Sequence, residues 1–105
     1  MYSRVTQIEI DITKIAVAEA MELLRREVLP SLRRQEGYEG VCVLTAPGGR
    51  GVLLSLWASP EAAAAAGETG LLPGMLAPFV TPVRSPGEPE GYEVAFADVP
   101  ALVIG

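Results

Sequence analysis

The 105 residues of this chain include 8 basic and 13 acidic residues and no histidine, which gives a formal charge of −5. One domain over residues 1-105 suits this length, because a chain of this size buries somewhat more than ~60% of its unfolded surface and folds without a disulfide or metal. The acidic balance argues against nucleic acid as a partner. No apolar run approaches the ~18 residues of a membrane span, and the N-terminus lacks the apolar core of a secretory signal. We therefore expect a cytoplasmic protein with neither a nucleic-acid nor a membrane partner.

Two elements are predicted before residue 37. Polar and apolar residues alternate over residues 4–12, which predicts a half-buried strand. Thr13 is placed to cap a helix from Lys14, whose apolar stripe comprises Val17, Met21, Leu24, Val28 and Leu32. Because Pro30 lacks a donor and crowds the preceding turn, the helix should kink there or divide in two. Gly37 supplies the left-handed residue that ends it.

The middle of the chain predicts an antiparallel hairpin and a short helix. Residues 38–46 and 52–58 are apolar strands, and Pro47-Gly48 suits the turn between them. Cys42, the only cysteine, is expected to be a small core residue in a reducing compartment. Ser59 is a favourable cap for a helix over residues 62–66, which Gly67 is expected to stop.

The rest of the chain predicts a connector and a last strand. Residues 70–91 are rich in Pro and Gly and form an extended connector, with apolar anchors at Leu71, Leu72, Met75, Leu76, Phe79 and Val80. Residues 92–99 are the last convincing strand, which Pro100 interrupts. The element order is therefore β-α-β-β-α-β.

The strand over residues 52–58 is apolar on both faces. Val52, Leu54 and Leu56 point one way, and Leu53 and Trp57 point the other. Two helices that follow right-handed crossovers cover only one face of such a sheet. A homodimer that packs sheet against sheet covers the second face. The alternative is a monomer whose Pro-rich connector folds across it.

Three motifs carry a resemblance to a known family: Gly37-Tyr38-Glu39-Gly40, Ser55-Leu56-Trp57-Ala58-Ser59-Pro60-Glu61, and Tyr92-Glu93-Val94. With them the chain resembles the dimeric α+β barrel superfamily, and within it the antibiotic-biosynthesis-monooxygenase-like domains. The resemblance covers residues 4–66 well and the remainder loosely. It implies a ferredoxin-like α+β fold with an antiparallel sheet, assembled as a homodimeric α+β barrel.

The resemblance also implies where a site would lie. The haem-degrading branch of this family uses a strand-one Asn, a strand-three Trp and a His near the end of the second helix. Trp57 matches the Trp, but the chain has no His, so a haem-degrading enzyme of the His-ligated type is not expected. The cofactor-free branch needs only an apolar cleft for a phenolic substrate, and the substrate-pocket candidates are Trp57, Tyr38, Gln7, Ser55 and Glu9.

Each candidate also has a structural interpretation. In that interpretation, Trp57 is a core residue and Tyr38 packs beside a helix end. Gln7 and Glu9 would then form a solvated or dimer-facing edge. Ser55 has no His or nearby Lys to activate it as a nucleophile. No metal and no cofactor is expected, and no catalytic residue is assigned.

Two functions remain open from the sequence. The first is a monooxygenase-like domain that binds a small aromatic or apolar molecule, with cofactor-independent oxygenation as the reaction that the resemblance implies. The alternative is a non-catalytic dimeric module for ligand sensing or protein interaction.

Overall fold

Five antiparallel strands form one sheet in the computed structural model, which describes residues 1–69, 78–83, 87, 89, 91–102 and 104. The strands are β1 (Tyr2–Ile10), β2 (Tyr38–Thr45), β3 (Arg50–Trp57), β4 (Val80–Val83) and β5 (Gly91–Glu93). They are arranged in the order β2-β3-β1-β4, and β5 also pairs with β1. The predicted α+β class with an antiparallel sheet is confirmed, and the strand order is compatible with a ferredoxin-like fold.

Strand β1 lies inside the sheet and organises the strands around it. One edge pairs with β3 from Tyr2 to Glu9, and the other edge is shared between β4 and β5. The alternation predicted for this strand is confirmed where β4 covers it, since Ile8 and Ile10 are buried whereas Gln7 and Glu9 are exposed.

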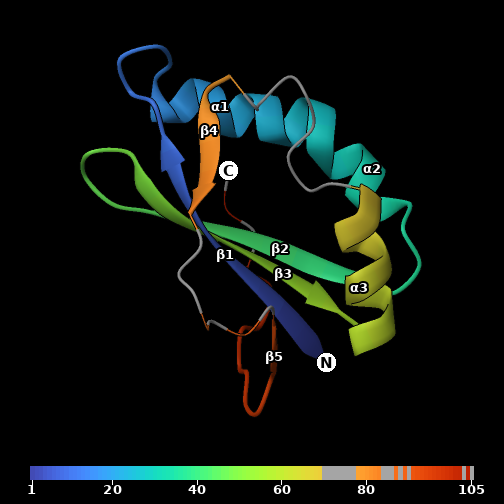
Figure 1. Cartoon of the computed structure of the whole chain (residues 1–105). Helices are drawn as coiled ribbons and strands as arrows, with labels where there is room; N and C mark the ends of the chain where they lie inside the picture. The colour runs from blue at the N-terminus through green and yellow to red at the C-terminus, as the bar shows by residue number, and fades with distance from the viewer. Residues whose placement is uncertain (70–77, 84–86, 88, 90, 103, 105) are drawn as a thin grey trace.

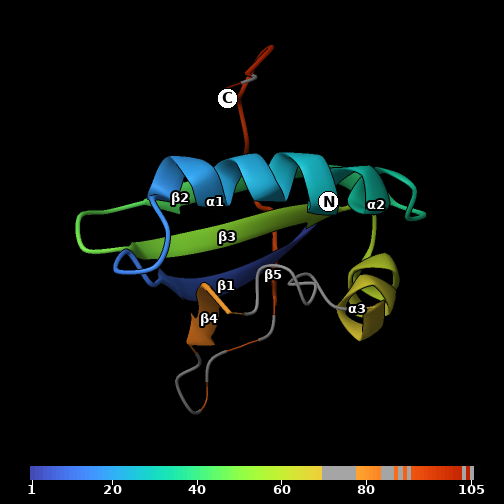
Figure 2. The ribbon, with the colours of Figure 1, turned by 90° about the horizontal axis from the view of Figure 1, so that it is seen from above.

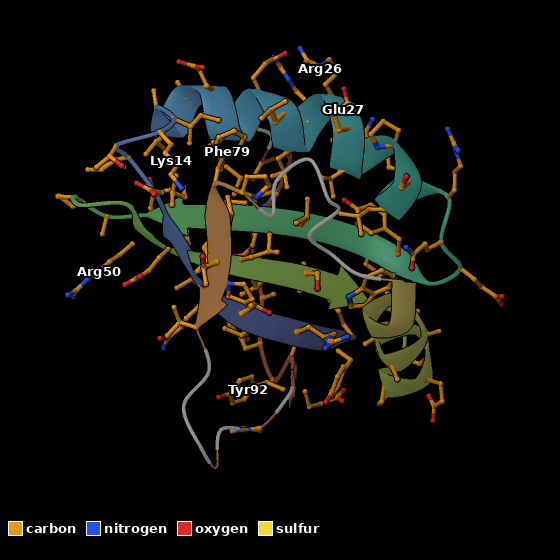
Figure 3. The ribbon with its side chains drawn as sticks, turned by 45° about the horizontal axis from the view of Figure 1, so that its top comes forward. Lys14, Arg26, Glu27, Arg50, Phe79 and Tyr92 are labelled. Carbon is orange, nitrogen blue, oxygen red and sulfur yellow. The ribbon has the colours of Figure 1, made fainter. Side chains whose placement is uncertain are left out.

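The end of the chain departs from the prediction. The strand expected over residues 92–99 is regular only in β5, and β4 forms inside the expected connector, where Val80 is buried against the core. Pro82 made this segment a poor strand candidate, but an edge strand such as β4 tolerates a residue without a donor. Phe79 also packs on the core, and Figure 3 shows it beneath α1. The anchors expected at Leu71, Leu72, Met75 and Leu76 lie outside the described residues.

Three helical segments follow one another over one face of the sheet: α1 (Val17–Leu23), the π-helical turn η1 (Leu24–Val28) and α2 (Leu29–Arg33) (Figures 1 and 2). The predicted division at Pro30 is confirmed. Pro30 cannot donate to the carbonyl one turn earlier, and the N–H of Leu29 instead reaches back five residues to the carbonyl of Leu24. The hydrogen-bond pattern therefore changes from π to α immediately before the proline.

The start of this helix is later than predicted. It begins at Val17 rather than Lys14, and no side chain caps it. Thr13 instead donates its N–H and its hydroxyl to Asp11 Oδ1, the N–H over 3.1 Å. This local bonding satisfies the Thr13 donors in a turn, which competes with the cap that we predicted.

Helix α3 (Pro60–Thr69) packs its small residues against the sheet. Ser59 caps it as predicted, since its Oγ accepts the N–H of Ala62 at 3.2 Å. Ala63 and Ala66 are buried, and the Ala63 carbonyl accepts a hydrogen bond from Arg4 on β1 at 3.1 Å. The helix continues past Gly67, where we expected it to stop, because a glycine inside a helix costs only about 1 kcal/mol.

The hydrophobic core lies between the helices and the sheet. Its buried members are Ile8, Ile10, Ile15, Ala20, Val28, Leu32, Leu53, Trp57, Ala63, Ala66 and Val80. The other face of the sheet, which we call the open face, presents Val5, Cys42, Leu44, Val52, Leu54, Leu56 and Val83. Cys42 is exposed there, so the prediction that it is a core residue is wrong. Cys42 and Val43 are adjacent in β2 and point to opposite faces of the sheet, so Cys42 faces away from the helices and Val43 faces them.

Candidate functional site

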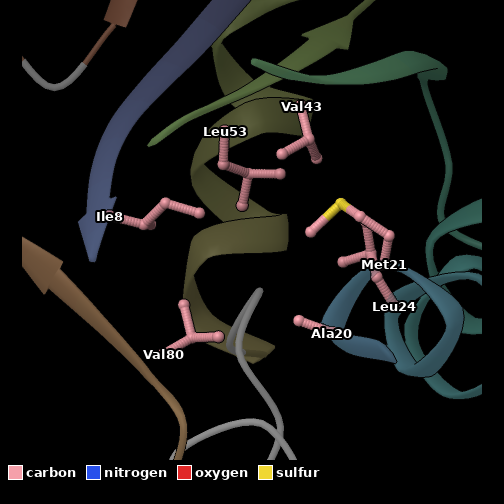
Figure 4. A pocket seen from close by; sticks show the side chains of 7 residues that line it. All are labelled: Ile8, Ala20, Met21, Leu24, Val43, Leu53 and Val80. Carbon is pink, nitrogen blue, oxygen red and sulfur yellow. The ribbon is translucent and has the colours of Figure 1, made fainter. Parts of the chain in front are cut away.

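A small cleft lies between the helical layer and the sheet (Figure 4). Seven apolar side chains from six elements line it: Ile8, Ala20, Met21, Leu24, Val43, Leu53 and Val80. The cavity volume is about 10 Å³, which is enough for about one water molecule. The cleft therefore offers an apolar surface and little empty volume.

The wall formed by the helix has two features that favour adaptation. Ala20 is fully buried and its methyl group fills little of the gap, so the cleft exists where a small side chain beside the apolar stripe meets the sheet. Met21 is unbranched and changes rotamer easily, and Leu24 begins the π-turn, where the regular hydrogen-bond ladder is interrupted. This wall is thus the part of the cleft best able to move.

The aromatic candidates meet in a separate group at the far end of β3. Trp57 is fully buried, and its Nε1–H donates to Ser55 Oγ at 2.9 Å. The ring of Tyr38 contacts the Trp57 ring edge-on, with 5.8 Å between the ring centroids and 75° between the planes. Burial raises the pKa of the Tyr38 phenol above its usual value of 10.0, and the charge of Arg33 partly opposes this, so the phenol is neutral at pH 7.

This aromatic group borders the cleft without lining it. Leu53 lines the cleft, and Ser55 and Trp57 follow it on the same face of β3 at steps of about 6.6 Å. The Ser55 hydroxyl is buried and already accepts the indole N–H, and the chain has no His that could act as its base. The group stabilises the core and offers a polar position next to the apolar cleft.

The two remaining candidates lie elsewhere. Gln7 and Glu9 are exposed on the open face, where Glu9 pairs across the strands with Arg50. Figure 3 shows Arg50 extending from the hairpin end of the sheet, away from the helices. The structure therefore brings Trp57, Tyr38 and Ser55 together and separates them from Gln7 and Glu9 by the thickness of the sheet.

Sequence reasoning did not single out the cleft residues. Met21 and Leu24 belong to the predicted helical stripe and Leu53 to the two-faced strand, but the same pattern is typical of any helix that packs on a sheet. The small Ala20, which flanks that stripe, is the one signal that could have indicated a gap.

Within the described ranges, no three His, Cys, Asp or Glu residues are grouped to hold a metal ion. The helices of that part of the chain are also too short or too polar to cross a bilayer. Comparison of the sequence with protein-family models and with curated proteins finds no match. The resemblance to monooxygenase-like domains therefore stays an expectation from the sequence.

Proposed function

We propose that this chain binds a small apolar molecule, with an aromatic ring as the best-fitting group, in the cleft between α1, η1 and the sheet. The observation that carries the proposal is the lining, which is apolar on every side and drawn from both layers of the fold. Ligand sites in small proteins are typically concave and mostly apolar, with a few polar groups that fix orientation. Ser55 stands one side-chain step beyond Leu53 on β3, and Tyr38 on β2 lies one step further, opposite Trp57.

The size of the cleft sets a requirement on binding. An apolar cavity of about 150 Å³ accepts benzene, whereas this cleft holds about one water, so the ligand must displace part of the wall. Met21 and the π-turn at Leu24 form the adaptable side, and we assign the opening movement to them. The affinity will be lowered by the free energy of that movement, which a ligand must offset.

The geometry favours binding over oxygenation. A cofactor-free oxygenase must stabilise a phenolate anion, and none of the cleft-lining side chains donates a hydrogen bond. The nearby Ser55 hydroxyl is engaged with Trp57, and the Tyr38 phenol is neutral. We therefore propose a binding function, and cofactor-independent oxygenation is the extension that would require Ser55 or Tyr38 to turn toward the ligand.

The test is a titration of the full chain with 1-naphthol, followed by methyl NMR. Binding in the cleft should shift the methyl signals of Met21, Leu24 and Leu53 and leave those of Leu44 and Leu54 on the open face unchanged. As the only tryptophan, Trp57 provides a second signal, because a ligand bound beside Leu53, two side-chain steps away on the same face of β3, should change its fluorescence.

Adjacent residues of β2 give a matched pair of variants. Val43→Phe fills the cleft and should weaken 1-naphthol binding about tenfold or more, which corresponds to about 1.4 kcal/mol. Leu44→Phe makes a comparable change one residue away on the open face and should leave the affinity unchanged. Saturable shifts confined to open-face methyls, or equal affinity in both variants, would show that the cleft is not the site.

A second candidate function, an interaction module, is favoured by a different surface. The open face presents aliphatic side chains on four strands, which is more than a ligand-binding monomer needs. For this surface we propose a second copy of this chain as the partner, because a two-fold arrangement covers both apolar faces with one surface.

A further inference from the structure

One cation on the helix side of the sheet has no carboxylate beside it. Arg4 lies on β1 and is partly buried, whereas every other Lys and Arg that the structure describes is exposed. Lys14, Arg25 and Arg26 form ion pairs with acidic side chains, but Arg4 forms none with the described residues. Removing a charge from water costs free energy unless an opposite charge lies close to it. The surroundings of Arg4 therefore favour an anion.

A hydrogen bond to α3 holds the guanidinium of Arg4 in place. Its Nη1 donates to the carbonyl of Ala63 at 3.1 Å, and Figure 1 shows α3 at the end of the sheet where β3 finishes. An Arg side chain carries several N–H donors, and this bond uses one of them. Because a carbonyl oxygen carries only a partial charge, the bond positions the cation without neutralising it.

The cleft and Arg4 are neighbours on the same face of the sheet. Leu53 lines the cleft and pairs directly with Thr6, so Arg4, two residues before Thr6, is the diagonal neighbour of Leu53. Such neighbours lie about 7–8 Å apart, which is within reach of a long side chain. Thr6 carries a hydroxyl and lies between Arg4 and the cleft residue Ile8 on this face of β1. The apolar cleft thus borders a cationic, hydroxyl-bearing end.

We propose that the ligand of the cleft is an apolar carboxylic acid, with its ring or chain against Leu53 and its carboxylate on Arg4. This inference rests on the proposed binding function and names the class of ligand. The planar guanidinium fork matches the two oxygens of a carboxylate, and such charge-assisted pairs are stronger than neutral hydrogen bonds. Partial burial of Arg4 strengthens the attraction further, because the effective dielectric constant there is lower than in water.

The formal charge of −5 does not oppose an anionic ligand. Interactions between exposed charges are largely screened beyond about 8 Å at physiological ionic strength, so the direct contact with Arg4 decides the affinity. The other role open to Arg4 is to tie α3 to β1 through Ala63 and nothing more. The two roles differ in one measurable respect, because only the first makes the affinity depend on the charge of the ligand.

Two compounds with the same ring test this dependence on the full chain. The carboxyl of 1-naphthoate is ionised at pH 7, whereas 1-naphthylmethanol carries a neutral hydroxymethyl group in its place. Both should shift the methyl signals of Leu53, and 1-naphthoate should bind at least about tenfold more tightly. The side-chain Nε–H signal of Arg4 should shift with 1-naphthoate and stay in place with the alcohol.

Variants of two arginines separate the contact from the overall charge. Arg4→Gln should abolish the preference for 1-naphthoate, because the carboxylate would then be partly desolvated without a cation. Arg50→Gln removes the same charge from the open face and should keep the preference within about twofold. Arg4→Lys keeps the charge and should retain part of the preference. The comparison within the wild type decides the question even if Arg4→Gln does not fold.

The outcomes distinguish this inference from the binding function on which it rests. If neither compound shifts the Leu53 methyls, the cleft binds no such ring and both proposals are wrong. Equal affinities of the two compounds in the wild type would overturn only the assignment of a carboxylate, because the ring would still bind. A loss of both compounds by the same factor in Arg4→Gln would also overturn it and leave Arg4 as the tie between β1 and α3.

Discussion

The hydrogen bond between Trp57 and Ser55 makes a quantitative prediction about the core. Both side chains are almost completely buried, and the N–H···O distance is 2.9 Å. Ser55→Ala removes the acceptor and leaves a buried indole N–H without a partner, which should cost about 1–3 kcal/mol. Trp57→Phe removes the donor and also shortens the ring, so it should cost at least as much. A protein of this length has a total stability of only about 5–15 kcal/mol, so either loss is easily measured.

The double variant distinguishes the hydrogen bond from simple packing. When both partners are removed, no buried polar group is left unpaired, so the combined loss should be smaller than the sum by about 1–2 kcal/mol. Urea denaturation of the wild type and the three variants at one protein concentration gives the four free energies of unfolding. The m-value must be the same in all four. Strictly additive losses would refute the interpretation of Ser55 as the buried partner of the indole.

Two further predictions concern the backbone and pH. Gly37→Ala should destabilise the protein by about 2–4 kcal/mol, because residue 37 has φ +82° and a new Cβ would lie 2.6 Å from Ala62 Cβ. Gly48→Ala is the control, because residue 48 has φ +90° but a new Cβ there would have nothing within 4 Å. It should cost only about 1–2 kcal/mol in the same urea assay. The hydrogen bonds from Thr13 hold the pKa of Asp11 below 3.8, so its contribution to stability is present above the unfolded pKa and lost as the pH falls through the folded pKa. Carboxyl NMR should show this low midpoint in the wild type and a higher one in Thr13→Ala, and equal midpoints would contradict the assignment.

The regular elements were predictable because their signals are local. The hairpin follows from two apolar runs around Pro47-Gly48, and Gly48 has the positive φ that the third position of such a turn requires. The division of the helix follows from the missing donor of Pro30. In each case one residue type enforces one backbone geometry, so tertiary contacts had little to decide.

The errors arose where tertiary contacts decided. Val80 forms a strand in a Pro-rich segment because it pairs with Ile10 and is buried against the core, and no local signal announces that pairing. Cys42 was assigned to the core because β2 is apolar throughout, and only the register with β3 shows which residues face the helices. The cleft was missed for the same reason, since a lining of core-type residues has no distinguishing pattern in sequence.

The two proposed surfaces follow from a single property of β3. Successive side chains of a strand point to opposite faces, so Leu53 enters the cleft while Leu54 enters the open face. Half of all residues are hydrophobic and the mean hydropathy is +0.33 despite a charge of −5. The helices cover one face of the sheet, and Leu44 and Val83 stay exposed on the other. Because the sheet separates the two surfaces, a change at Val43 should affect the ligand and a change at Leu44 the dimer. The two proposals can therefore fail independently, and neighbouring residues of one strand decide between them.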